Sequence, residues 1–179
     1  MVIDRTRVAY GTDQPVVTLT MPEFAIESNG RIEKTAVYYN GEQIAGVREV
    51  FVNIDEEGAF DAVVQYQGED GQLYTKQIFT DYFEHVRMRE PSFDEDEARS
   101  LRLLMISSEG DLGTTVVYRD GEEQFGIVSV LVHMKPPGNT SSGIRSWFGG
   151  RKDVPDATEF KAMITYRNDD DTLSTEGIF

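Results

Sequence analysis

The sequence predicts an all-β protein made of two tandem five-stranded meander repeats. Short runs of β-branched and aromatic residues alternate with turn dipeptides along the chain. The second half of the chain repeats the first, and only one short segment has helical character. We expect the repeats to close as a barrel, a sandwich or a pair of small barrels, with a short helical linker between them.

An internal duplication organises the chain. A shift of 80 positions aligns residues 24–52 with residues 104–132, and a shift of 100 aligns residues 60–79 with residues 160–179. Chance would give roughly one or two identities in each window. The identities are Ile26 with Ile106, Ser28 with Ser108, Gly30 with Gly110, Thr35 with Thr115, Val37 with Val117, Tyr38 with Tyr118, Gly41 with Gly121, Glu42 with Glu122, Gly46 with Gly126, Val50 with Val130, Val52 with Val132, Phe60 with Phe160, Ala62 with Ala162, Tyr66 with Tyr166, Asp70 with Asp170, Leu73 with Leu173, Thr75 with Thr175, Ile78 with Ile178 and Phe79 with Phe179. The chain therefore divides into a first repeat with an N-terminal hairpin (1–79), a helical and acidic linker (80–100), and a second repeat (101–179) with an inserted loop (135–159).

The first strands of each repeat end at dipeptides that suit a tight turn. The N-terminal hairpin is predicted from VVTLTM at 16–21, and the first strand of each repeat from FAIE at 24–27 and LMIS at 104–107. TAVYY at 35–39 and TTVVY at 114–118 follow, and they end at Asn40-Gly41 and Asp120-Gly121. Both dipeptides tolerate positive φ at the two central positions, which is the requirement of a type I′ hairpin.

The remaining strands follow in the same order in both repeats. Residues 47–54 and 127–134 alternate their valines onto one face. A turn at 55–58 leads the first repeat into FDAVVQY at 60–66, which matches FKAMITY at 160–166. Turns at 68–71 and 168–171 then lead into the last strands, QLYTKQIF and TLSTEGIF.

The linker is the segment with helical character. Asp81 and Glu84 have the spacing of a capping box, and Tyr82, Phe83 and Val86 would form one buried face. We therefore expect one or two helical turns within residues 80–100.

The composition is that of a folded acidic protein. Of the 179 residues 39% are hydrophobic and 11% aromatic, and the net charge is −15. This charge argues against direct binding to a nucleic-acid backbone or an anionic membrane, because both would repel the protein. The absence of cysteine excludes disulfides, thiolate metal centres and cysteine nucleophiles. No signal-peptide pattern or membrane-span pattern is present, so we expect a cytoplasmic protein.

No combination of residues predicts an active site, so we expect no enzymatic activity, no metal and no cofactor. The sequence has no G-x-S-x-G elbow and no phosphate-binding glycine loop, and no nucleophile accompanies His85 or His133. Residues 53–58 resemble the start of a calcium loop, but its twelfth position is Val64 instead of a bidentate glutamate. That segment and the turn at 168–171 are interpreted as solvated hairpin tips.

The insertion in the second repeat is the strongest candidate for a functional segment. Residues 135–152 carry four positive residues and no acidic one, whereas the rest of the chain carries −19. Loops of this length are usually functional or disordered, and Trp and Arg are the residues that most often anchor interfaces. We expect a non-enzymatic adaptor or assembly component that contacts another protein through Arg145, Trp147, Phe148, Arg151 and Lys152. One alternative for this loop is that it folds back onto the acidic body, with Trp147 filling a gap. Another is a lid over a barrel mouth, with Trp147 and Phe148 closing on an apolar ligand.

Two further hypotheses stay open. The first is a β-barrel that carries a small apolar ligand, lined by the recurring Tyr38, Tyr66, Tyr118 and Tyr166. The second is an acidic decoy that binds a basic partner through residues 94–97 and the hairpin carboxylates. Exposed sheet edges would also permit a homodimer.

Overall fold

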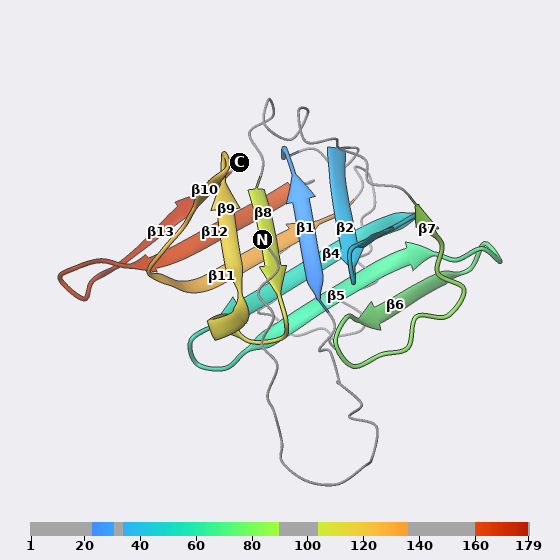
Figure 1. Ribbon diagram of the computed structural model, residues 1–179, viewed down its shortest axis with the longest axis horizontal. Helices are drawn as coiled ribbons and strands as arrows, with labels where there is room; N and C mark the ends of the chain where they lie inside the picture. Colours follow the sequence, from blue (N-terminus) through green and yellow to red (C-terminus); the bar gives the residue numbers. More distant parts are fainter. Residues whose placement is uncertain (1–22, 31–33, 90–103, 136–159, 179) are drawn as a thin grey trace, which may run out of the picture.

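Two antiparallel sheets make up the part of the chain that the computed structural model describes, which is residues 23–30, 34–89, 104–135 and 160–178 (Figure 1). The seven-stranded sheet has the order β10-β9-β8-β1-β2-β3-β7, with β1 (Phe24–Ser28), β2 (Thr35–Tyr39), β3 (Glu42–Ile44), β7 (Met88–Arg89), β8 (Leu104–Ser108), β9 (Val116–Arg119) and β10 (Glu122–Glu123). The six-stranded sheet has the order β13-β12-β11-β4-β5-β6, with β4 (Val47–Asp55), β5 (Phe60–Gln67), β6 (Leu73–Gln77), β11 (Ile127–Met134), β12 (Phe160–Arg167) and β13 (Leu173–Gly177). The all-β prediction is confirmed. The hairpin predicted at 16–21 lies outside the described residues.

The tight turns form where the dipeptides predict them. Asn40 and Gly41 have φ values of 51° and 81°, and Asp120 and Gly121 have 54° and 81°. Positive φ at both central positions matches the right-handed twist of the flanking strands, so β2–β3 and β9–β10 are short hairpins.

Strands from the two halves of the chain pair at the centre of both sheets. We call residues 23–89 the first half and residues 104–178 the second half. In the seven-stranded sheet β1 pairs with β8 so that Ile26 faces Ile106, and in the six-stranded sheet β4 pairs with β11 so that Val52 faces Val132. Each of these pairs joins two residues that the shift of 80 aligns. The two halves therefore share both sheets instead of folding as separate bodies.

One apolar core lies between the sheets. Strand residues alternate toward it with the two-residue period of a β-strand. The seven-stranded sheet contributes Phe24, Ile26, Val37, Ile44, Leu104, Ile106 and Val117, and the six-stranded sheet contributes Val50, Val52, Ile54, Ala62, Val64, Tyr66, Val130, Val132, Met134, Ala162 and Ile164. Each of these side chains is at most 2% exposed, so side chains fill the space between the sheets.

The predicted barrel closures are wrong. The end strands of the seven-stranded sheet are β10 and β7, those of the six-stranded sheet are β13 and β6, and neither sheet closes on itself among the described strands. A pair of small barrels is excluded for the same reason, because each half divides its strands between the two shared sheets. Turn and strand patterns specify local pairs, whereas closure depends on contacts between distant strands.

The predicted helix at the start of the linker is also wrong. Residues 80–87 form turns and loop and lead into β7, and residues 90–100 lie outside the described residues. The Asp81 carboxylate accepts a hydrogen bond from the upstream amide of Gln77 at 2.8 Å, so it does not cap a following helix. His85 has a φ of 50°, in the left-handed region, which interrupts a right-handed helix.

A 3₁₀ turn forms at Leu112–Thr114, and none of the described residues is in an α-helix. There Asp111 Oδ1 accepts a hydrogen bond from the Thr114 amide. None of the described residues belongs to a helix with the length and apolar character needed to cross a membrane.

Candidate interaction surface

The loop predicted to bind a partner connects β11 to β12. The predicted contact residues Arg145, Trp147, Phe148, Arg151 and Lys152 lie outside the described residues. The base of the loop is described: Met134 at the end of β11 faces Phe160 at the start of β12 in antiparallel register. The inserted segment therefore leaves and returns at one end of the six-stranded sheet, as a hairpin loop does.

A buried pair of polar side chains lies next to this base. His133 Nε2 and Glu49 Oε1 are 2.8 Å apart, and each side chain is only 1% exposed. Both lie on the outer face of the six-stranded sheet, because His133 alternates with the inward Val132 and Glu49 alternates with the inward Val50. The ring of Phe51 packs edge-on against His133 at 5.5 Å. The outer face is therefore buried where the loop begins.

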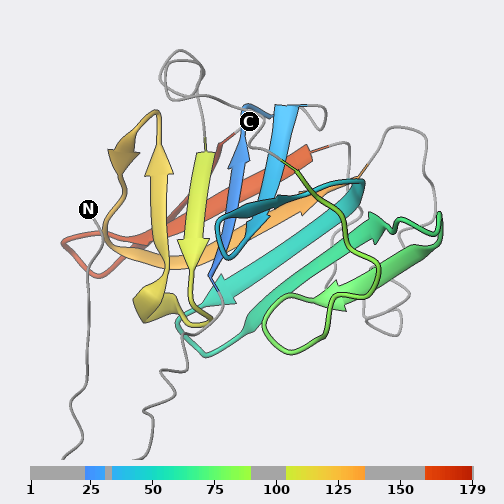
Figure 2. The same cartoon turned by 45° about the vertical axis from the view of Figure 1, so that its right-hand side comes forward.

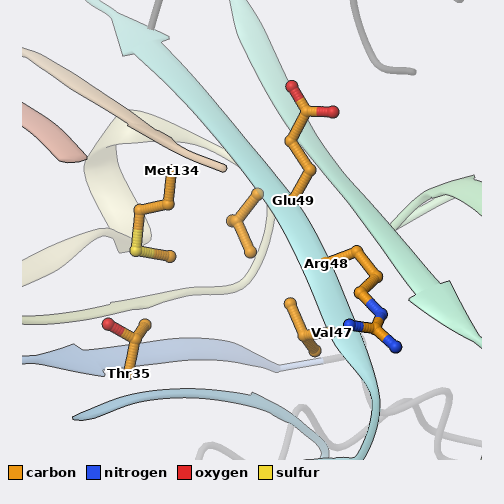
Figure 3. A pocket seen from close by; sticks show the side chains of 6 residues that line it. Thr35, Val47, Arg48, Glu49 and Met134 are labelled. Atoms are coloured by element: carbon orange, nitrogen blue, oxygen red, sulfur yellow. The ribbon is translucent and has the colours of Figure 1, made fainter. Parts of the chain in front are cut away.

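The inner side of β4 has a small pocket at the same end (Figure 3). Its lining residues are Thr35, Val47, Arg48, Glu49, Val50 and Met134. Figure 3 shows Thr35 and Met134 on one side of β4 and the Glu49 carboxylate on the other. The volume is about 30 Å³, which is room for about one water molecule, whereas small-molecule sites usually exceed about 300 Å³. This pocket is too small for an apolar ligand.

The four recurring tyrosines lie on two different faces. Tyr38 and Tyr118 are on the outer face of the seven-stranded sheet, where the Tyr38 hydroxyl donates to Glu27 at 3.0 Å. Tyr66 and Tyr166 point inward from the six-stranded sheet. The ring of Tyr66 is stacked between Tyr74 and Phe83, at centroid distances of 5.6 and 5.7 Å. The four side chains therefore do not line a common cavity.

We expect tyrosine ionisation to destabilise the fold at high pH. Burial raises the pKa of Tyr66 from 10.0 to about 12, and burial beside Glu27 raises the pKa of Tyr38 as well. Because the pKa of the tyrosine is higher in the folded state, the neutral side chain contributes its full share to the free energy of unfolding below pH 10. This contribution is lost as the pH rises from 10 toward 12. Urea unfolding at pH 8 to 12 should show this fall, and Tyr66→Phe should make it shallower. An unchanged slope in Tyr66→Phe would show that Tyr66 does not contribute.

In the two acidic turns, aspartate carboxylates accept hydrogen bonds from backbone amides of the same turn. Asp55 Oδ1 accepts from the amides of Glu57 and Ala59 at 3.0 and 2.9 Å, and Asp170 Oδ1 accepts from the Thr172 amide at 3.1 Å. Both turns connect paired strands, β4 to β5 and β12 to β13, so they are hairpin tips. No group of three His, Asp or Glu side chains suited to a metal ion occurs among the residues that the structure describes.

Sequence reasoning missed an open surface at the far end of the second half. Phe125 is 76% exposed there, whereas the aligned residue of the first half is Ala45, which is partly buried. Tyr166 is half-buried, whereas the aligned Tyr66 is fully buried. In the sequence, the only sign of this difference is that Phe125 stands where the first half has Ala45. The structure adds that residues 83–89 cover the surface around Ala45.

Two surfaces are thus candidates for contact with a partner: the loop between β11 and β12, and the open end of the second half. No protein-family model, curated protein or solved structure matches this chain.

Proposed function

We propose that this protein is a non-enzymatic protein-interaction module, an adaptor or assembly component, that contacts its partner through loop 135–152. The observation that carries the proposal is the register of Met134 with Phe160 at the base of the loop. A loop whose two ends are held together on a sheet presents its side chains from a defined position at low entropic cost. The side chains presented are the single tryptophan of the chain and a group of basic residues.

Charge supports the same proposal. The loop carries four positive residues and no acidic one on a body of net charge −19. A partner with an acidic, apolar pocket would complement Trp147 and Arg145, which belong to the residue types most often found at interface hot spots.

We further infer that the body is a duplicated unit arranged as a sandwich. Support comes from the pairing of aligned residues, Ile26 with Ile106 and Val52 with Val132, at the centre of the two sheets. The bulges in β4 and β11 occur at aligned positions as well, after Val47 and after Ile127. A body of this kind serves as a scaffold, because its interior is filled with side chains.

Combining Trp147→Ala with Arg145→Ala should abolish partner capture without affecting folding. Removal of two hot-spot side chains usually costs several kcal/mol, roughly a hundredfold or more in affinity. The measurement is quantitative affinity capture from extract of the source cells by the wild-type protein and by the double variant. Proteins retained by the wild type should be lost from the double variant.

A matched control removes an exposed aromatic residue and an arginine elsewhere. Tyr82 is 80% exposed and Arg48 is exposed, so Tyr82→Ala with Arg48→Ala makes the same chemical change on the body. This control should retain the captured proteins. If the loop variant retains them equally well, the loop is not the contact and the proposal is wrong.

A further inference from the structure

The two halves differ at the outer edge of the seven-stranded sheet. In the first half β3 is covered by β7: Ile44 faces Met88, and the Ala45 amide donates to the Arg87 carbonyl at 2.8 Å. In the second half β10 occupies the matching position, and no strand among the described residues pairs with its outer edge. Figure 1 shows β7 at the right of the view and β10 at the left.

An aromatic ring fixes the covering segment of the first half. Residues 78–87 run from β6 to β7 across the side between the sheets, in light green in Figure 2. Phe83, only 9% exposed, stacks on Tyr66 at 5.7 Å and on Tyr39 at 5.0 Å. The Tyr66 hydroxyl donates to the Glu84 carbonyl at 2.7 Å. The segment is thus held by one aromatic anchor and by backbone hydrogen bonds.

The second half retains one part of the surface on which Phe83 packs: the counterpart of Tyr66 is Tyr166, whereas the counterparts of Tyr39 and Tyr74 are Arg119 and Ser174. Tyr166 aligns with Tyr66 and is half-buried, and no ring among the described residues stacks on it. Its hydroxyl donates to Gln124 Oε1 at 3.2 Å. Beside it Phe125 is 76% exposed, next to the open edge of β10. An aromatic side chain placed against Tyr166 as Phe83 is placed against Tyr66 would bury the exposed part of the Tyr166 ring.

The corresponding surface is more acidic in the second half. Where the first half has Gln43 and Gly71, the second half has Glu123 and Asp171. Glu176, which replaces Lys76, is paired with an arginine of the same chain. The arginines that the second half gains at aligned positions are paired within the chain: Arg119 with Glu176 at 2.9 Å and Arg167 with Glu56 at 2.6 Å. The segment that fits this edge is therefore more basic than residues 82–89 are.

We propose that the edge of β10, with Tyr166 and Phe125, is a docking site for an extended, basic segment of a partner protein that carries an aromatic side chain ahead of its pairing strand. The partner segment adds a strand to β10, as β7 does to β3, and inserts its aromatic ring against Tyr166. This site is separate from loop 135–152 and does not depend on the function proposed for that loop.

A peptide of residues 82–89 is the direct probe of this site. In the intact protein the first-half site is filled by its own tethered segment, whose effective concentration is high, so free peptide has only the second-half site. Calorimetric titration should show saturable binding at a 1:1 ratio. The Phe83→Ala peptide should bind at least tenfold more weakly, and the Glu84→Lys peptide at least threefold more tightly. Salt should weaken the binding of the basic peptide.

Matched protein variants locate the binding. Glu123 and Phe125 are exposed, so Glu123→Lys with Phe125→Ser should leave the fold intact while weakening binding at least tenfold. The control, Glu42→Lys with Leu73→Ser, changes exposed residues of the first half and should bind within twofold of the wild type. Absence of saturable binding, or equal loss in the two variants, would overturn the proposal. Sedimentation that shows a dimer broken by Glu123→Lys with Phe125→Ser would also overturn it, because the edge would then be filled by a second copy of this chain.

Discussion

Replacing Tyr66 with alanine should lower the free energy of unfolding by about 4 kcal/mol, because large-to-small changes of fully buried aromatic residues cost about 3–5 kcal/mol. The ring is stacked between Tyr74 and Phe83, and its hydroxyl donates to the Glu84 carbonyl. Alanine would leave a cavity and free the segment that Phe83 anchors. Urea denaturation followed by circular dichroism gives the difference directly.

The matched change in the second half is the control. Tyr166 aligns with Tyr66 but is half-buried, and its hydroxyl reaches only the side chain of Gln124. Tyr166→Ala should therefore cost less, about 2 kcal/mol, because the Tyr166 side chain is partly exposed and has less buried area to lose than Tyr66. Equal losses for the two variants would contradict the inferred asymmetry between the halves. Tyr66→Phe, which removes only the hydroxyl, should cost about 1 kcal/mol.

The local elements of the fold could be predicted because each has a short-range cause. Asn40-Gly41 and Asp120-Gly121 force positive φ, and the alternation of Val50 with Val52 specifies which side of the strand is buried. These signals extend over a few residues. The pairing of β1 with β8 joins residues about 80 positions apart, and no short-range signal specifies it.

The linker shows why a local signal can fail. Asp81 and Glu84 have the spacing of a helix cap, but Phe83 gains more by stacking on Tyr39 and Tyr66, which come from two different sheets. Tertiary burial of one aromatic ring outweighs the small preference of an isolated helical turn, which is marginal in water on its own. The same contact explains β7, which the sequence pattern does not predict.

One part of the candidate site could be predicted from the sequence, and another part could not. The basic loop stands out by composition, so the sequence alone predicts it as a contact, and this stays a prediction because residues 136–159 lie outside the described residues. The contact of Glu49 with His133 was not foreseeable, because the residues are 84 positions apart and it depends on the pairing of β4 with β11.

Removing the Glu49 carboxylate should also have a large effect on the free energy of unfolding. Glu49→Ala should lower the free energy of unfolding by about 3 kcal/mol, because breaking one partner of a buried polar or charged pair typically costs about 3–5 kcal/mol. Both side chains are only 1% exposed, so water cannot replace the lost contact without a local opening. The aligned change Ser129→Ala, on the same outer face, should stay within about 0.5 kcal/mol.

A double-mutant cycle separates the contact from other effects of the substitution. Glu49→Leu and His133→Leu should each be strongly destabilising, whereas the combined variant should cost clearly less than the sum, since it removes both members of their contact at once. A coupling of at least about 1.5 kcal/mol is expected for such a pair, and additive costs would show that the 2.8 Å contact contributes nothing.

Because His133 immediately precedes Met134, where the loop begins, Glu49→Ala should also raise amide hydrogen exchange in residues 131–135 more than elsewhere in β11. Faster exchange confined to residues 131–135 would mean that the contact between Glu49 and His133 stabilises the end of β11, where the loop begins.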